Sequence, residues 1–422
     1  RFPSAAFAWR LKEENFLRDA QFLSNLKLRA SYGISGEQGI PLYQTFSSLN
    51  STNVWMNQVL YTGFYPARSA DPNLRWEKTR QFDFGVDAGF LDNRLNLTID
   101  IYRKLTTDLL YRKALPPSSG FQSMLKNIGS TENKGLEISA DAYIIDNKNL
   151  KWFLNINNSW NRNKVLELGD GRKEIINPSG GLDGGDLKSW PSILRVGEPL
   201  GILYGYLSDG VIYDEAEAEI ALQMGQVLPF PGELKIVDVN KDGTINDEDK
   251  VVIADANPDF IGGMTNSFNY KNFQFDVLMQ WVYGNDILNY QHLANQRLTL
   301  GYNATKEWYD NRWTPENPNR FEPRAGYDVR AYTDVSYHVF DGSYLRINNV
   351  TLSYFMPKSF LNKAKLKSLK LSEMVENLYT FTIYMGWTPD ISSMGDNVMG
   401  QGVDSGTYPV PRTISFGINI GF

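Results

Sequence analysis

The chain has 422 residues, a formal net charge of −6, 13% aromatic residues, two histidines and no cysteine. The missing cysteines exclude disulfides and thiolate metal sites, two histidines leave little for histidine-based catalysis or zinc binding, and the negative charge argues against a nucleic-acid partner. Mean hydropathy is −0.37 and no apolar run is long enough for a membrane-spanning helix, although a β-barrel wall escapes that test because only every second residue faces lipid.

Segments in which apolar and polar residues alternate occur along the whole chain. Residues 94–101 alternate leucine or isoleucine with asparagine, threonine or aspartate, and residues 82–90, 273–283 and 414–422 repeat the pattern with more aromatic side chains. This period predicts strands with one apolar and one polar face. The segments are longer than soluble strands and suit a tilted crossing of a bilayer. We expect eleven strands, near residues 3–13, 24–34, 74–91, 94–111, 133–146, 150–168, 259–271, 272–284, 340–357, 366–383 and 410–422.

The connections between these segments alternate between short and long. Short periplasmic turns and long extracellular loops are typical of outer-membrane barrels, whereas a soluble β-sandwich has no reason to sort its loops by length. The pattern predicts an all-β protein, a transmembrane antiparallel β-barrel with extracellular long loops. The short connections are 14–23, 92–93, 147–149, the turn near Lys271 and 358–365, and the long ones are 35–73, 112–132, 169–258, 285–339 and 384–409.

Eleven such strands are not expected to close a wide barrel alone, because each unpaired backbone group at an open edge costs several kcal/mol in lipid. We therefore expect further strands from the same polypeptide or from a separate chain. The sequence begins at Arg1 with a segment that already reads as a strand and has no signal peptide, which indicates the middle of a longer protein.

The most specific local motif lies in the longest loop, 169–258. Residues 238–249, DVNKDGTINDED, match calcium loops in which oxygen ligands at positions 1, 3 and 5, a carbonyl at 7 and a carboxylate at 12 surround the ion. Gly243 permits the sharp turn, and an aspartate replaces the usual glutamate at position 12, as in dockerin-like loops. We expect a structural Ca²⁺ that pins the loop, and the alternative is a solvated acidic turn. The predicted ligands are Asp238, Asn240, Asp242, Thr244 through its backbone, and Asp249.

Carboxylates on the polar strand faces provide the only catalytic alternative, that of a glycosidase. A water-facing lumen also favours polar side chains, and Arg29, Arg80 and Arg103 can offset their charge. No P-loop, G-x-S-x-G or dinucleotide-binding fingerprint follows a strand, so we predict no enzyme. Loop aromatic residues are candidates for stacking on sugar rings or contacting a partner, with ordinary packing as the alternative. The carboxylates are Asp83, Asp87, Asp100, Glu137, Asp141 and Asp276; the aromatic residues are Tyr204, Tyr206, Trp308, Trp313 and Trp387.

Several stretches resemble the SusC/RagA family of TonB-dependent outer-membrane transporters of Bacteroidetes, and together they cover essentially the whole chain. The last stretch ends in Phe422, a terminal aromatic residue that resembles the signal for assembly into the outer membrane. The stretches are LSNLKLRASYGISGEQ (23–38), NLRWEKTRQFDFGVDAGFLDNRLNLTIDIY (73–102), NIGSTENKGLEISADA (127–142), GSYLRINNVTLSY (342–354) and YPVPRTISFGINIGF (408–422).

The resemblance implies a 22-stranded barrel with an N-terminal plug, of which this chain would supply the last eleven strands. It further implies import of oligosaccharide or peptide nutrients, driven by TonB. The implied partners are a SusD-like surface lipoprotein that acts as a lid, TonB through an N-terminal region with no counterpart here, the N-terminal half of the barrel, and surrounding lipid and lipopolysaccharide. The alternatives are a passive or adhesive surface protein without energy coupling, and a soluble calcium-binding β-protein.

One stretch departs from the family pattern. Residues 369–380 carry Glu373 and Glu376 where the family has small and apolar residues. A carboxylate on the lipid face of a barrel is costly. We therefore expect a shift of register in this stretch or a position near the rim.

Overall fold

The computed structural model describes residues 2–37, 46–121, 123–169, 171–176, 191–296, 303–325, 334–391 and 400–422. Parts of all five predicted long loops therefore lie outside the described residues. None of the helices within the described ranges is long and apolar enough to cross a membrane.

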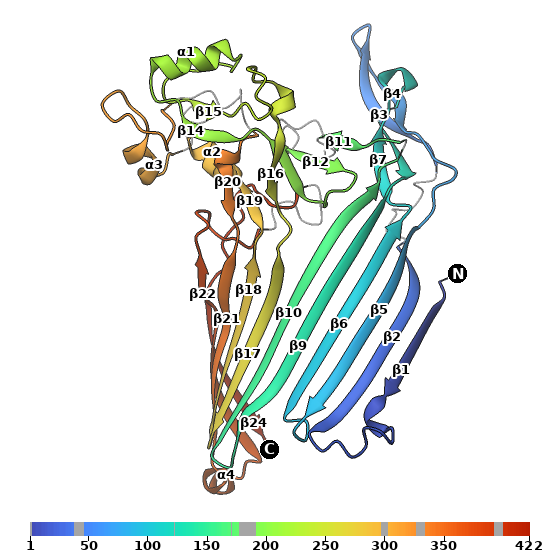
Figure 1. The fold of residues 1–422 in the computed structure, drawn as a ribbon, viewed down its shortest axis with the longest axis vertical. Helices are drawn as coiled ribbons and strands as arrows, with labels where there is room; N and C mark the ends of the chain where they lie inside the picture. Colours follow the sequence, from blue (N-terminus) through green and yellow to red (C-terminus); the bar gives the residue numbers. More distant parts are fainter. Residues whose placement is uncertain are drawn as a thin grey trace.

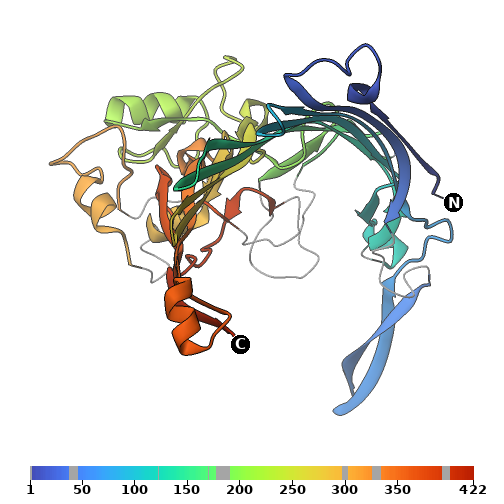
Figure 2. The ribbon, with the colours of Figure 1, turned by 90° about the horizontal axis from the view of Figure 1, so that it is seen from below.

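Eleven strands form one antiparallel sheet (Figure 1). Each corresponds to one of the eleven predicted segments, and the observed ends differ from the predicted ones by at most four residues. The sheet is strongly curved and does not close on itself (Figure 2), which confirms the prediction of part of a barrel wall. In order across the sheet, the strands are β1 (Ser4–Arg10), β2 (Leu23–Glu37), β5 (Glu77–Phe90), β6 (Leu95–Thr107), β9 (Ser130–Asp146), β10 (Leu150–Glu167), β17 (Phe260–Tyr270), β18 (Phe273–Tyr283), β21 (Tyr344–Phe355), β22 (Ser368–Thr382) and β24 (Thr413–Gly421).

The register of the sheet gives it one apolar and one polar face. Phe84 of β5 lies opposite Ile101 of β6, which lies opposite Leu136 of β9. In the next row, Asp100 lies opposite Glu137. Ile101 is 54% exposed, as expected of a side chain that faces hydrocarbon. The two-residue period of the sequence thus becomes rows of apolar side chains that run across neighbouring strands.

The register of β22 shows where the two unusual glutamates point, and a β-bulge follows directly after them. Ile347 of β21 lies opposite Tyr379, whereas Asn349 lies opposite Glu376, so β22 contains one extra residue between the two pairs. Asn377 occupies this bulge with a φ of 53°. Both glutamates precede this bulge, in a stretch of β22 that pairs with β24 without any shift, so plain alternation puts Glu376 on the polar face. Glu373 remains on the apolar face, in the middle of the strand.

The short turns at one end of the sheet lie where they were predicted and are up to four residues longer than predicted. One contains the helix α4 (Lys358–Ala364), and another contains a 3-10 turn, Leu11–Glu13, directly after β1. At the tight turn between β17 and β18, Lys271 has a φ of 52°, the left-handed conformation that two-residue hairpin turns require.

The long loops at the other end contain more structure than the sequence predicted. Two of them form separate hairpins, β3 (Ser48–Met56) with β4 (Val59–Arg68) and β7 (Leu110–Ala114) with β8 (Ser123–Asn127). The other three build a folded layer above the wall (Figure 1), which we call the cap: the described residues of 171–258, 285–341 and 384–409. Its elements are β11 (Glu174–Ile176), β12 (Ser192–Arg195), β13 (Ile202–Gly205), β14 (Ser208–Val211), α1 (Glu215–Gln223), β15 (Leu234–Ile236), β16 (Val251–Asp255), β19 (Asp286–Asn289), α2 (Tyr290–Gln296), α3 (Lys306–Asn311), β20 (Val339–Asp341) and β23 (Val403–Asp404).

Candidate functional site

The cap has its own hydrophobic core, to which three loops contribute. One cluster joins Leu203 and Ala254 of the first loop to Leu288 of the second and Val403 of the third. Strand β19 pairs antiparallel with β20 and parallel with β23, so the second and third loops also share a small sheet. Long loops that bury apolar residues together form a defined structure rather than independent segments. The prediction of 169–258 as one extended loop therefore understated its packing.

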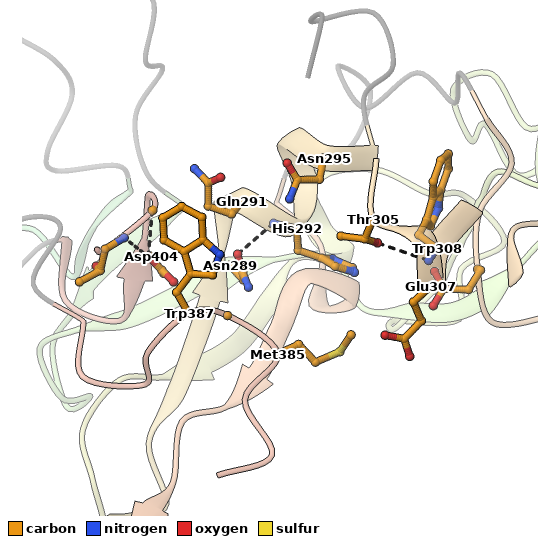
Figure 3. A pocket seen from close by; sticks show the side chains of 14 residues that line it. Asn289, Gln291, His292, Asn295, Thr305, Glu307, Trp308, Met385, Trp387 and Asp404 are labelled. Carbon is orange, nitrogen blue, oxygen red and sulfur yellow. Dashed lines mark hydrogen bonds between the residues drawn. The ribbon is translucent and has the colours of Figure 1, made fainter. Parts of the chain in front are cut away.

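A pocket of about 250 Å³ opens in this cap between α2, α3 and the third loop (Figure 3). Two of the loop aromatic residues singled out in the sequence, Trp308 and Trp387, line it, whereas Tyr204, Tyr206 and Trp313 lie outside its lining. The lining combines aromatic rings with amides and carboxylates, the mixture that recognises polar organic ligands. The lining residues are Asn289, Gln291, His292, Asn295, Thr305, Glu307, Trp308, Glu322, Met385, Gly386, Trp387, Asp404, Gly406 and Thr407.

A chain of hydrogen bonds fixes one wall of the pocket. The Nδ1 atoms of His292 and His338 lie 3.0 Å apart, and Nε2 of His292 lies 2.9 Å from Nε2 of Gln296. Gln296 also donates to the hydroxyl of Tyr337, which donates to Glu322 at 2.7 Å. Burial lowers the pKa of His292 to about 4. His292 is therefore neutral near pH 7, where it accepts from Gln296 and donates to His338.

Two acidic side chains of the pocket differ in their surroundings. Burial, reinforced by the nearby charge of Glu307, raises the pKa of Glu322, while the Tyr337 hydroxyl opposes the shift. Asp404 is buried, accepts from the Tyr384 hydroxyl at 2.6 Å, and accepts from two backbone N–H groups of the same loop. Asp404 therefore holds the third loop in place. Glu322 accepts fewer hydrogen bonds than Asp404, so its carboxylate can accept further ones from a ligand.

Sequence reasoning missed most of this pocket. The two histidines lie 46 residues apart, and the amides of α2 have no spacing that distinguishes them from ordinary loop residues. The aromatic residues were visible only as candidates, because no sequence signal joins α2 to residues 385–387. The sequence does not show which long loops pack against one another, and the pocket depends on that packing.

The calcium-type loop lies in the cap and folds on itself. Asp249 is fully buried, and its carboxylate accepts from the backbone N–H groups of Val239 and Asn246 at 2.9 Å each. Asp238 accepts from the N–H groups of Lys241 and Gly243, the latter with a φ of 85°. The twelfth position thus returns to the start of the loop, as the predicted coordination requires.

The remaining predicted ligands follow the same turn. Asn240 accepts from the N–H of Asp242, and Asp242 accepts from the N–H of Thr244. Within the described part of the chain, no three histidine, cysteine, aspartate or glutamate side chains converge as a ready-made metal site. Each carboxylate oxygen can accept more than one hydrogen bond or bind an ion beside it, so the loop has oxygen atoms left for a cation.

Phe422 directly follows β24 and is 81% exposed. The neighbouring carbonyl of Gly421 accepts from the backbone N–H of Lys367, which places this end of the strand beside α4 and the short turns. The role of Phe422 in outer-membrane assembly stays a prediction.

Five of the six carboxylates singled out on the polar face of the wall accept a hydrogen bond from a neighbouring side chain. Arg29 donates to Asp87 at 2.8 and 2.9 Å and to Asp100 at 3.0 Å, as expected from the sequence. Asp141 accepts from Asn96, Asp83 from Ser31 and Asp276 from Gln274. Arg103 instead pairs with Glu132, and Arg80 lies opposite Ile34 and Leu105 on the apolar face.

Comparison with known proteins gives a consistent result. The family model described as TonB dependent receptor-like, beta-barrel, matches residues 2–188. The TonB-dependent receptor P3 of Formosa agariphila is 37% identical over all of this chain and 42% of its own length. The TonB-dependent receptor SusC of Bacteroides thetaiotaomicron is 30% identical over all of this chain and 40% of its own length. The solved RagAB peptide transporter has the same fold, with a TM-score of 0.82 at 23% identity over all of this chain and 43% of that one.

The two-faced, curved sheet with short turns at one end and a folded cap at the other is the wall of a transmembrane β-barrel of the outer membrane. The chain spans less than half the length of the curated relatives that it matches. It belongs to the SusC/RagA family of TonB-dependent receptors, and it corresponds to the C-terminal part of their barrel.

Proposed function

We propose that the complete protein imports oligosaccharide or peptide nutrients across the outer membrane, with energy supplied through TonB and a SusD-like lipoprotein as its lid. The observation that carries this proposal is the position of the pocket. It lies in the packed cap above the wall, in which β6 and β9 pair polar residues such as Asp100 and Glu137 on one face. A solute held in the cap has a water-compatible path along that face. SusC and a RagAB peptide transporter among the similar proteins support the same reading.

The lining of the pocket indicates a broad class of substrate. Trp387, which is 67% exposed, offers a flat apolar surface, and Asn289, Gln291 and Asn295 offer paired donors and acceptors. Sugar rings and peptide backbones both match this combination. The lid would close over this surface and trap the solute, which would be released when the plug is remodelled from below.

Uptake by the producing organism tests the proposal. Cells that carry the intact gene should accumulate a labelled nutrient, and accumulation should stop when the proton-motive force is collapsed or TonB is removed. Trp387→Ala should lower uptake at limiting substrate, whereas Tyr309→Ala, an exposed residue outside the pocket lining, should not. Copurification of a surface lipoprotein from detergent-solubilised membranes tests the lid.

The alternative function is a passive or adhesive surface protein. It predicts that solute equilibrates across the membrane without accumulation, or that no solute crosses at all while cells lose adhesion when the gene is deleted. Accumulation that survives collapse of the proton-motive force would reject energy coupling and favour this alternative.

We also propose that residues 238–249 bind Ca²⁺, which would stabilise the cap and take no part in transport chemistry. The return of Asp249 to the start of the loop and the left-handed Gly243 support this assignment. Calcium should raise the melting temperature of the purified protein, and Asp238→Asn with Asp242→Asn should abolish that rise. Glu248→Gln, at a position that supplies no predicted ligand, is the matched control. A solvated acidic turn predicts no calcium effect in any of these proteins.

A further inference from the structure

The turn between β21 and β22 carries an unusual concentration of positive charge. We define the basic turn as residues 357–368, which contain Lys358, Lys363, Lys365 and Lys367, all exposed. No aspartate or glutamate occurs between residues 342 and 372. By contrast, the short turn at residues 11–22 mixes two basic residues with three acidic ones. The charge of the basic turn is therefore a local feature and not a property of every short turn.

These four lysines have no acidic partner among the side chains that the structure describes; every ion pair found there involves other residues. At another short turn, for comparison, Lys151 pairs with Asp146 at 2.9 Å. Lys271, in the turn between β17 and β18, adds further charge nearby. That turn lies close to the basic turn, because the Asn272 carbonyl accepts from the backbone N–H of Phe355, two residues before the basic turn begins. Lys370 is left out, since it lies on the polar-face row with its ammonium 5.4 Å above the Phe355 ring.

The backbone of the basic turn is fixed, so its lysines are held in one region. Helix α4 buries Leu361 against the end of the wall, and the N–H of Leu366 donates back to the Leu361 carbonyl at 3.0 Å. Lys365 ends the helix in the left-handed conformation, with a φ of 56°. Phe360, on the same helix, is 48% exposed.

The location of the basic turn identifies what it meets. Figure 1 shows α4 at the end of the wall that carries the short turns. In an outer-membrane barrel the short turns face the periplasm, at the level where hydrocarbon gives way to headgroups. Clustered lysines beside an exposed aromatic residue are the usual arrangement of an anionic-lipid surface. Each lysine near such a surface raises affinity about fivefold.

We propose that the basic turn binds the phosphate groups of anionic phospholipids in the periplasmic leaflet of the outer membrane, with Phe360 inserted between the headgroups. The consequence is a preference for anionic lipid at one side of the barrel wall, next to β21, β22 and β24. This site is independent of the cap and of transport.

The test uses the protein purified from its own outer membrane and placed in nanodiscs of phosphatidylethanolamine and phosphatidylglycerol. Retained lipids are counted by native mass spectrometry. The wild type should retain phosphatidylglycerol about tenfold over its share of the mixture at low salt, and this enrichment should vanish near 1 M salt, where the screening length is about 3 Å. Replacing all four lysines by glutamine should bring the enrichment close to parity, and replacing all four by arginine should preserve it.

Two controls test whether a loss of enrichment comes from misfolding or from the removal of lysines in general. Heat-modified mobility on gels reports whether each variant keeps a folded barrel, and Lys148→Gln with Lys306→Gln removes lysines outside the basic turn. Equal enrichment in the wild type and the glutamine variant would overturn the proposal, as would enrichment that persists at high salt. A glutamine variant that loses binding to purified peptidoglycan while its lipid content is unchanged would also overturn it, by assigning the basic turn to the cell wall.

Discussion

Glu373 of β22 lies directly opposite Phe416 of β24, in a row that continues to Leu352 of β21 on the apolar face of the wall. The strand alternates regularly from Ser368 to Glu376, so Glu376 faces the polar side and Glu373 the apolar side, and the bulge at Asn377 follows both. This pair puts a carboxylate among apolar side chains that face lipid. It therefore provides a direct measurement of the cost of an acidic group at that position.

Replacing Glu373 by leucine should stabilise the barrel. Removing a carboxylate from the lipid face should raise the free energy of unfolding by about 1–2 kcal/mol, below the 2–4 kcal/mol typical of arginine or lysine at mid-membrane. Denaturant unfolding in lipid vesicles measures the change. Glu376→Leu, on the polar face, is the control and should give no gain. An unchanged or lower stability for Glu373→Leu would show that its carboxylate has a partner in the membrane.

Substitutions at Asn377 should separate backbone strain from side-chain contacts. Its left-handed φ of 53° is unfavourable for a β-branched residue, so Asn377→Val should lower the free energy of unfolding by about 1–2 kcal/mol. Asn377→Gly removes the hydrogen bond from Nδ2 to the Pro411 carbonyl but relieves the strain, so its loss should be smaller. The same unfolding assay ranks the two variants, and a larger loss for glycine would contradict the assignment of the bulge.

Acidification should loosen the cap. The pKa of His292 falls from 6.5 in the unfolded chain to about 4 in the fold, so between these values the unfolded chain binds more protons. The stabilisation is complete above pH 6.5 and is lost as pH falls toward 4, by at most about 3 kcal/mol. Hydrogen exchange of α2 and β19 at pH 7 and pH 5 measures the local opening.

The control for this pH dependence is a pair of substitutions. Glu322 acts in the opposite direction, because its pKa is raised in the fold and protonation at low pH is favourable there. His292→Gln should therefore flatten the loss of protection between pH 7 and 5, and Glu322→Gln should steepen the loss near pH 5. Identical profiles in all three proteins would exclude His292 as the titrating group.

The bond between Tyr384 and Asp404 should hold the third loop in the cap. Tyr384 is buried, and its surroundings raise the pKa of its hydroxyl, so it donates at every physiological pH. Tyr384→Phe leaves the buried carboxylate without this donor and should destabilise the cap by about 1–3 kcal/mol. Limited proteolysis within residues 384–409 should become faster, while Tyr309→Phe, at an exposed position, should leave it unchanged.

The wall could be predicted from the sequence because its physical cause is local. Residues such as Leu97 and Ile99 face lipid and their neighbours face water, and this two-residue period needs no knowledge of the rest of the chain. The bulge at Asn377 was harder to predict, since the alternation on either side of it does not reveal an extra residue in the pairing. The glutamates before it indicated a departure from the family pattern, and Glu373 remains on the apolar face.

The cap could not be predicted in the same way. Leu203 and Val403 belong to one cluster although 200 residues separate them in the sequence, and no periodicity links short strands of three or four residues. The pocket depends on this packing, so only its aromatic members were visible beforehand. The calcium-type loop was visible because all its predicted ligands lie within residues 238–249, and its ion remains to be tested.

The shared core of the cap limits how this surface can change during evolution or by engineering. A loop that contributes Leu288 or Val403 to a common cluster is not a module that can be exchanged alone, since its removal exposes apolar surface on the other two. New specificity should therefore arise from point changes around the pocket mouth, or from transplanting all three segments together. Chimeras that swap a single segment should misassemble even when the foreign segment comes from a close relative.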